Sequence, residues 1–279
     1  MAFNTYQSPP QLQSRLGEWT VTVLGSDGIR LTDGTHFHLD EGPKFVYLSI
    51  YRAAADARQI DIVRKREARV TATTGDKAVV QWDPVEENKV ELSATYSLSE
   101  DPDAIEMEIA VEALQPYQGY ELFVSSYFSP YHTPRFALKG NSVDSDVAIR
   151  WYETSWYGTQ NDEAWPRDDE ARQHFCDGRW LTRPSQVWRL GPDHALPLMT
   201  QRHKHDQAHV ISMARPQDCI GLSGYNGFHN SQYFHLFGRD VSAGDTLNTT
   251  VRMEIFKQTA EDLDALALQR YQAWIEKDE

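Results

Sequence analysis

Apolar and polar residues alternate with a period of two along much of the chain. Between residues 90 and 98 the even-numbered positions are apolar and the odd-numbered ones are polar. Between residues 105 and 109 the apolar positions are the odd-numbered ones, after a turn-forming segment at 100–103. Such alternation puts one side of a strand in the core and the other in water. The two segments therefore predict a half-buried antiparallel pair of strands.

The same alternation recurs before and after this pair. Residues 71–74 and 78–82 flank a Gly75-Asp76 turn and predict a hairpin, and residues 247–255 predict a late strand after a turn at 242–245. Shorter strands are expected at 20–24, 45–51, 120–128, 147–152, 186–190, 195–201, 208–214 and 232–237. On the inward side of the strands we expect Leu92, Tyr96, Ile109, Val251 and Met253 to be buried.

Signals for helices are few. Thr259 precedes Asp262 at capping-box spacing, and apolar residues from Leu263 to Ile275 lie close to one face, which predicts a C-terminal helix. Residues 53–67 are consistent with a short helix or with a charged surface loop. The longest irregular stretch, 158–184, is typical of a functional lid or an insertion. We expect a single all-β domain over residues 1–279, with two large antiparallel sheets and a short C-terminal helix.

The net charge of the chain limits the classes of partner that it can bind. Its 279 residues carry 41 acidic against 27 basic side chains, a net charge of −14. A field of this sign repels phosphate backbones and anionic lipids, so we expect neither nucleic acid nor membrane as a partner. No signal peptide or apolar run of membrane-spanning length is evident, which favours a cytoplasmic protein. Local motifs for ATP, NAD or acyl-serine chemistry are also missing from the sequence.

Aromatic residues are concentrated in one region of the chain. Eleven of them fall between Tyr117 and Tyr157, about twice the number that the average composition would give. Tyrosine and tryptophan rings suit sugars, because C–H faces stack on the rings while hydroxyls and indole N–H groups form hydrogen bonds. The alternative is that the rings fill the core. We predict that Tyr152, Trp156 and Tyr157 line a sugar pocket.

Five of the ten histidines fall between residues 203 and 235. If one strand ran through His203, His205 and His209, the three imidazoles would share a face and could bind Zn²⁺ or a similar divalent metal. The polar segment around them is equally typical of a turn between two strands, and contact with a substrate is a third interpretation. His229 lies in a predicted loop at a sheet rim. Because histidine titrates near neutral pH, we consider His203, His205 and His229 as candidate acid/base groups.

Charged residues within aromatic surroundings form a third set of candidates. Glu153 and Glu121 could act as acid or base if burial raised their pKa values, and Arg135 or Arg239 could hold a sugar carboxylate. Tyr131 and His132 lie next to Arg135 in the sequence and complete this set, with Tyr225 as a further candidate for substrate contact. Structural ion pairs are the alternative for each of these charges.

A late segment carries a resemblance to a known family. It comprises Gly221-Leu222-Ser223-Gly224-Tyr225, then residues 231–240, then the turn Ala243-Gly244-Asp245-Thr246 before the final strand. It resembles the last strands of galactose-mutarotase-like proteins. The resemblance implies a β-supersandwich that binds carbohydrate on its concave face. It also implies a histidine general acid, for which His203, His205 and His229 are candidates, and a late glutamate base, which has no counterpart here. The lyase domains of the same fold use Tyr, His and Arg.

Three functions follow from these observations. The first is a carbohydrate-active enzyme of epimerase or lyase type that moves protons at a sugar carbon and takes a small-molecule or oligosaccharide substrate. The second is a carbohydrate-binding protein without catalysis. The third is a metal-dependent sugar enzyme that uses the histidines at 203–209.

Overall fold

The structure is a computed structural model of the 279-residue chain. It describes residues 12–16, 19–32, 46–74, 76–100, 103–130, 132–140, 148–154, 161–181, 187–203, 209–226, 229–256 and 262–277.

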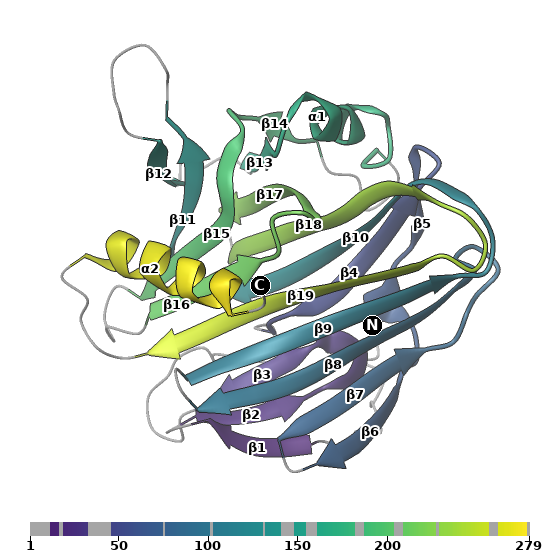
Figure 1. Ribbon diagram of the computed structural model, residues 1–279, viewed down its shortest axis with the longest axis horizontal. Coiled ribbons are helices and arrows are strands. Elements are labelled where there is room, and N and C mark those ends of the chain that lie inside the picture. The colour runs from purple at the N-terminus through teal and green to yellow at the C-terminus, as the bar shows by residue number, and fades with distance from the viewer. Residues whose placement is uncertain are drawn as a thin grey trace, which may run out of the picture.

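Three sheets form within the described residues (Figure 1). The nine-stranded sheet has, in order, β12 (Ile149–Glu153), β11 (His132–Lys139), β15 (His194–His203), β16 (His209–Ala214), β19 (Thr246–Phe256), β9 (Asp103–Ala113), β8 (Val90–Glu100), β7 (Lys77–Trp82) and β6 (Arg69–Thr74). The seven-stranded sheet has β14 (Arg189–Leu190), β13 (Asn161–Pro166), β17 (Cys219–Asn226), β18 (Asn230–Val241), β10 (Tyr117–Phe128), β4 (Ser49–Ala55) and β5 (Arg58–Asp61). The small sheet has β1 (Leu12–Leu16), β2 (Trp19–Val23) and β3 (Ile29–Thr32).

One apolar core lies between the two large sheets, and the small sheet adds side chains such as Trp19 and Ile29 to it. The alternation read from the sequence determines which positions enter this core. The predicted pair of strands is β8 and β9, which run antiparallel with Leu92 opposite Val111 and Tyr96 opposite Met107. The burial prediction is confirmed for all five residues: Leu92, Tyr96, Ile109, Val251 and Met253. The protein is an all-β sandwich, as the pattern predicted.

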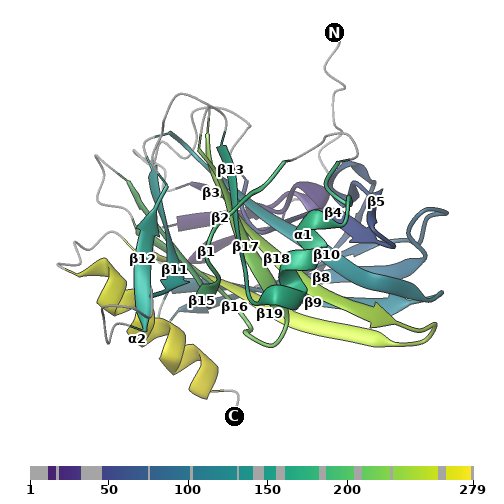
Figure 2. The same cartoon turned by 90° about the horizontal axis from the view of Figure 1, so that it is seen from above.

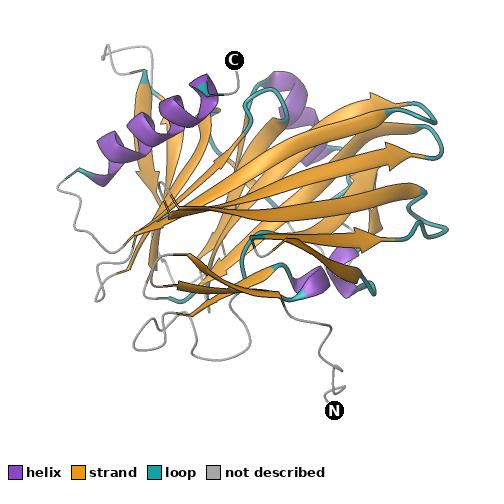
Figure 3. Cartoon of the chain, turned by 60° about the horizontal axis from the view of Figure 1, so that its bottom comes forward, coloured by secondary structure: helices purple, strands orange, loops and turns teal. Residues whose placement is uncertain are grey.

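The C-terminal helix α2 (Leu263–Glu276) lies on the outer side of the nine-stranded sheet, across β11, β15 and β16 (Figures 1 and 3). Its N-cap is Asp262, whose side chain accepts hydrogen bonds from the two backbone N–H groups of Asp264 and Ala265. Leu263, Tyr271 and Trp274 are buried against the sheet. Because α2 covers the outer side of the sheet here, every residue of β16 is buried: one face of this strand meets the core and the other meets α2.

Two segments differ from their sequence-based interpretation. Residues 53–67 contain the hairpin of β4 and β5 and a 3-10 turn, Val63–Lys65, in place of a helix or loop. The stretch 158–184, interpreted as irregular, contains β13 and the helix α1 (Asp169–Cys176). The pattern failed at β13 because both of its faces are covered, so the strand does not alternate between apolar and polar residues. Within the described residues, no helix is long and apolar enough to cross a membrane.

Candidate functional site

The outer face of the seven-stranded sheet, which points away from the core, collects aromatic and hydroxyl side chains. Leu122, Val124 and Phe128 of β10 point into the core. By alternation, the intervening residues of β10 point outward, as do their partners in the antiparallel register on β18, β17 and β13. This face therefore carries a row of Phe, Tyr, Ser and His side chains, and it has two parts with different environments.

The first part, here called the covered half, lies beneath α1 and the segment after it. Figure 2 shows α1 in front of β17 and β18. Trp180 packs at 5.1 Å from Phe123 and 5.1 Å from His235, measured between ring centroids. Phe175 of α1 lies 4.5 Å from His235. A Cβ at Gly221 of β17 would come within 2.6 Å of the Phe175 ring, so glycine at this position lets α1 approach the sheet.

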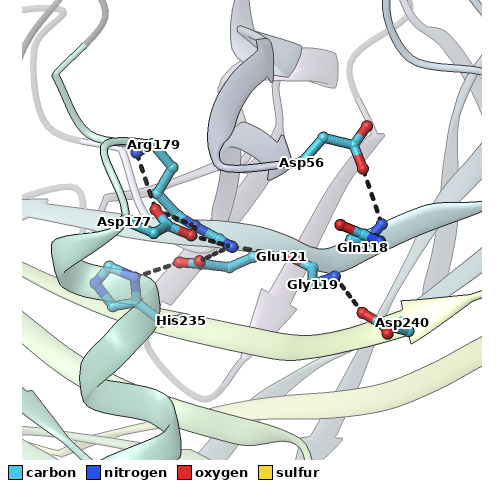
Figure 4. A network of polar contacts seen from close by, with 8 residues as sticks. All are labelled: Asp56, Gln118, Gly119, Glu121, Asp177, Arg179, His235 and Asp240. Carbon is cyan, nitrogen blue, oxygen red and sulfur yellow. Dashed lines mark hydrogen bonds and ion pairs between the residues drawn. The ribbon is translucent and has the colours of Figure 1, made fainter.

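A chain of polar contacts runs through the covered half (Figure 4). The His235 Nδ1 and Glu121 Oε1 atoms are 2.6 Å apart, and Arg179 donates to Glu121 Oε2 at 2.8 Å. Arg179 also donates to Asp177, and the Ser223 hydroxyl lies 2.8 Å from His235 Nε2. Burial alone would raise the pKa of Glu121, but the His235 hydrogen bond and the Arg179 charge outweigh it and hold the pKa below its usual value.

This chain has the connectivity of a serine nucleophile, a histidine base and an orienting acid. Its position prevents that use, because Ser223 and His235 are 0% exposed, with Trp180 and Trp188 packed on the His235 ring, and no reactant can approach the hydroxyl. Burial lowers the pKa of His235 despite the Glu121 carboxylate, so the imidazole stays neutral and links two strands. The arrangement fixes the segment that carries Arg179 on the sheet, and its role is structural.

We call the second part of the outer face the tyrosine face; Tyr127 and Tyr225 are half-exposed there, and Tyr233 is buried. The rings of Tyr127 and Tyr233 pack edge to face, with centroids 6.1 Å apart and an interplanar angle of 82°. His229 lies 4.9 Å from Tyr127 and 4.8 Å from Tyr225, and its Nδ1 is 2.6 Å from the Ser231 hydroxyl. The tyrosine face comprises Tyr51, Tyr127, Tyr225, Tyr233, His229, Asp162, Arg52 and Arg64.

A β-bulge brings two neighbouring residues of β4 to this face. Phe123 pairs with Arg52 and the next residue, Val124, pairs with Ile50, so Tyr51 is the extra residue of the bulge. In a regular strand Tyr51 and Arg52 would point to opposite sides of the sheet. Here the Tyr51 ring lies 6.0 Å from Phe123 on the outer face, and the Arg52 guanidinium lies 4.6 Å from the Tyr51 ring centroid.

Asp162 is the acid of the tyrosine face. It lies on β13 opposite Tyr225, so the two side chains share the outer side of the sheet. Burial raises the pKa of Asp162 to about 6, and the charge of Arg52 opposes this shift only in part. A carboxyl group with such a pKa can both accept and donate a proton close to neutral pH. Burial also raises the pKa values of Tyr127 and Tyr233, which remain neutral hydrogen-bonding phenols.

Comparison with solved protein structures identifies the fold of the chain. No family model and no curated protein matches the sequence. A candidate aldose 1-epimerase from Escherichia coli K12 matches with 9% identity and a TM-score of 0.54, over 88% of this chain and 98% of its own. A protein of Synechocystis sp. PCC 6803 matches with 10% identity and a TM-score of 0.55, over 92% and 99%. The chain has the galactose mutarotase-like fold.

A larger enzyme contains the same fold as one part. The α-N-acetylgalactosaminidase of Bifidobacterium bifidum, solved with GalNAc, matches with 9% identity and a TM-score of 0.58. The match covers 95% of this chain but 39% of that enzyme. At these identities the likeness concerns the galactose mutarotase-like fold and leaves the reaction open.

Two of the residues selected from the sequence lie on the tyrosine face of this fold. Tyr225 and His229 are half-buried there, on β17 and just before β18. Four others, His205, Tyr131, Trp156 and Tyr157, lie outside the described residues.

The other histidines are elsewhere. His132 and His203 face each other across β11 and β15, with ring centroids 4.8 Å apart, and both are buried. Burial and the neighbouring His203 lower the pKa of His132 to about 3, so His132 is neutral over the physiological range. This pair lies on the inner side of β11, where Phe136 also enters the core, and not on the tyrosine face.

The alignment of histidines expected for a metal site does not occur between His203 and His209. They belong to two strands, β15 and β16, and His209 pairs with Arg202, which places His203 and His209 on opposite faces of the sheet. The condition for a shared face, one strand through 203–209, is therefore not met, and the two-strand interpretation holds. Among the described residues, no group of three His, Cys, Asp or Glu side chains is arranged to hold a metal ion.

The remaining candidates make structural contacts away from the tyrosine face. Arg135 donates to both carboxylate oxygens of Asp264, at 2.6 and 2.5 Å, and so fixes α2 to the sheet. Glu153 lies opposite Arg135 in the register and is exposed. The Tyr152 hydroxyl lies 3.2 Å from Glu163, and Arg239 pairs with Asp218.

The charged residues of the tyrosine face were not evident from the sequence. Asp162 fell in the stretch interpreted as irregular, and Arg64 fell in the segment 53–67, which was left between helix and loop. Arg52 lies between that segment and the strand expected at 45–51. The aromatic density did include Tyr127, which was a signal for this region. A bulge in β4 could not be read from its sequence, because Ser49–Ala55 lacks the glycine or proline that often marks one.

Two hollows lie on the outer side of the nine-stranded sheet, with volumes of about 360 and 330 Å³. Strands β8, β9 and β19 supply most of their lining, including Glu91, Ser93 and Asn248. The one aromatic residue in the linings, Trp82, is 2% exposed and offers no ring face to a ligand. We therefore take the tyrosine face as the candidate site for a sugar.

Proposed function

We propose that this protein is a carbohydrate-active enzyme that binds a sugar on the tyrosine face and moves a proton at a sugar carbon, as an epimerase or a lyase does. Asp162 is the acid/base group in this proposal. The observation that carries it is a carboxyl group with a pKa of about 6, next to Tyr225 on an aromatic, half-exposed surface. The galactose mutarotase-like fold supports a sugar as the ligand by analogy.

The neighbouring side chains have complementary roles. The rings of Tyr127 and Tyr225 offer apolar surface to the C–H face of a sugar, and their hydroxyls offer hydrogen bonds. His229 lies between these two rings and is held by Ser231, so it can contact a sugar hydroxyl or exchange a second proton. Epimerisation and elimination at a carbon next to a carbonyl or carboxyl group both begin with loss of a proton from that carbon, which a carboxylate near its pKa can accept.

The test is the pH dependence of turnover with the Asp162→Asn variant. A thermal-shift screen of sugars first identifies a ligand, and exchange of its C–H proton with deuterated solvent is then followed by NMR. We expect Asp162→Asn to lower the exchange rate by about 10²-fold or more. The wild-type exchange rate should depend on pH with an apparent pKa near 6, and this pH dependence should disappear in the variant.

Asp83→Asn is the matched control, because the Asp83 side chain is 71% exposed on the other large sheet. It should leave the exchange rate unchanged. If Asp162→Asn retains the wild-type rate and pH profile, the acid/base assignment is wrong. Binding of a sugar with no exchange in the wild-type protein would support the second function, carbohydrate binding without catalysis, which the half-exposed rings of Tyr51, Tyr127 and Tyr225 alone could provide.

A further inference from the structure

Side-chain amides join the two large sheets at one end of the core, where β18 faces β11 and β15. The Gln232 Nε2 group donates to the backbone carbonyl of Thr200 at 2.9 Å, and the Asn230 Nδ2 group donates to the backbone carbonyl of His132. Phe234, two residues after Gln232, enters the core. Alternation along β18 therefore places both amides on the inner side of their sheet.

These hydrogen bonds fix which end of each amide points away from the opposite sheet. A flipped amide would set its oxygen against a backbone carbonyl oxygen, so the nitrogen must stay where it donates. The Gln232 Oε1 and Asn230 Oδ1 atoms are left without a hydrogen-bond partner among the described residues. The two residues are 1% and 4% exposed. Because buried polar atoms in native proteins are nearly always paired, these two oxygens indicate a bound ligand.

Gln201 of β15 adds a third amide from the opposite sheet. Its partner in the register, Val210, and Met199 two residues earlier both enter the core, so the Gln201 side chain points inward as well. The peptide group between Thr200 and Gln201 is the one that Gln232 binds. Gln201 is 0% exposed, and within the part of the chain that the structure describes neither its amide oxygen nor its amide nitrogen has a partner.

The chemistry of these three amides suits a monovalent cation. Carbonyl oxygens are hard ligands that can replace the hydration shell of Na⁺ or K⁺. The cost of burying an ion rises with the square of its charge, and among the described residues no carboxylate is bonded to these amides, so a divalent ion would be much harder to bury. A net charge of −14 also attracts cations to the protein.

We propose that a sodium or potassium ion binds between the two large sheets, held by the side-chain oxygens of Gln201, Asn230 and Gln232. This site is independent of the proposed function. It lies on the reverse side of β18 from the tyrosine face, because Asn230 and Gln232 alternate along this strand with Ser231 and Tyr233. The bound ion links β18 to β15 and holds in place the strand that carries part of the tyrosine face.

The test is thermal unfolding of the full chain in NaCl, in KCl and in choline chloride at equal concentrations. Choline matches the ionic strength but is too large to fit between the sheets. We expect NaCl or KCl to raise the Tm above its value in choline chloride, and the rise should saturate with concentration. At ten times the dissociation constant it should amount to about 3 °C or more. The two salts distinguish sodium from potassium.

A variant assigns this rise to the amides. Gln201→Met removes one ligand and should abolish the difference between the salts. It should be at least as stable as the wild-type protein in choline chloride, because an apolar side chain of similar length replaces a buried amide that has no partner. Gln81→Met is the matched control, since Gln81 is exposed on β7, and it should keep the full rise in Tm.

Three results would overturn the proposal. Equal Tm values of the wild-type protein in all three salts would show that ordered water is enough for the buried amides. A rise in Tm that Gln201→Met retains would belong to acids on the surface. Sodium NMR of the wild-type protein gives a measurement that does not depend on the folding of a variant: a sodium line that shows no saturable broadening, together with no effect of KCl on the Tm, would exclude the site.

Discussion

The covered half and the tyrosine face are made by the same strands and point to the same side of one sheet, yet they shift the pKa of an acid in opposite directions. Glu121 in the covered half is 1% exposed and has a lowered pKa. Asp162 on the tyrosine face is less buried and has its pKa raised to about 6. The charged and hydrogen-bonding partners of an acid therefore decide whether its pKa is raised or lowered, and the depth of burial alone does not.

The aromatic rings differ between the two regions in the same way. In the covered half, Trp180 and Trp188 pack around His235 and fill the space above the sheet. On the tyrosine face, Tyr127 and Tyr225 meet His229 and stay half-exposed. The comparison indicates that one half of the surface serves stability and that the other remains available to a ligand.

Removal of the Arg179 side chain should have the largest effect on the stability of the protein. Arg179→Ala leaves the buried Glu121 carboxylate without its guanidinium, which typically costs about 3–5 kcal/mol of unfolding free energy. Equilibrium unfolding in urea measures the loss. Arg69→Ala, at an exposed pair, should change stability by less than about 0.5 kcal/mol. A loss below about 1 kcal/mol for Arg179→Ala would show that the contact chain does not stabilise the covered half.

Ring deletions in the two halves should differ. Trp180→Ala removes a ring that is 3% exposed and should cost about 3 kcal/mol or more, the usual loss for a buried aromatic residue. Tyr225→Ala removes a half-exposed ring and should cost about 1 kcal/mol, while weakening sugar binding. Thermal and urea unfolding of both variants give the comparison. Equal losses would mean that the tyrosine face is part of the core.

The two acids should give opposite pH dependences. The pKa of Glu121 is lower in the folded state than in the unfolded chain, so Glu121 contributes stability above its unfolded pKa. That contribution is lost as the pH falls through the lower, folded-state pKa. Urea unfolding between about pH 2 and pH 6 should therefore show a fall in stability on the acid side. The fall should be shallower in Glu121→Gln; an identical slope would contradict the lowered pKa.

Asp162 should give the opposite pH dependence of stability, with the smallest effect on the free energy of unfolding. Its folded pKa of about 6 exceeds the ordinary value of 3.8, so the folded state gains stability as the pH falls from 6 to 4. Asp162→Asn should remove this slope and raise stability at pH 7 by about 1 kcal/mol, because solvent screens a half-exposed group. Urea unfolding at pH 4 and pH 7 measures it. A less stable Asp162→Asn protein at pH 7 would indicate that Asp162 serves structure.

The sequence predicted the strands of the nine-stranded sheet better than the candidate site. Alternation at 90–98 and 247–255 was clear because each strand there has one face in the core and one in solvent, and Leu92 and Val251 are buried as expected. On β13 and β16 both faces are covered, so the alternation was weak, and Asp162 was missed with β13. Of the candidates chosen for chemistry, Tyr225 and His229 lie on the tyrosine face.

The sequence by itself determined the strands that have one face in the core and one in solvent, such as those at 90–98 and 247–255, and which of their side chains enter the core, because alternation is a local property that each such strand carries alone. Only the tertiary structure decided which residues share the tyrosine face. Arg52, Tyr127, Asp162 and His229 are far apart in the chain and meet through the order of strands in the sheet and one bulge in β4. The opposite pKa shifts of Glu121 and Asp162 were likewise beyond the sequence, because the energy of a charge depends on the partners and solvent that the fold places around it.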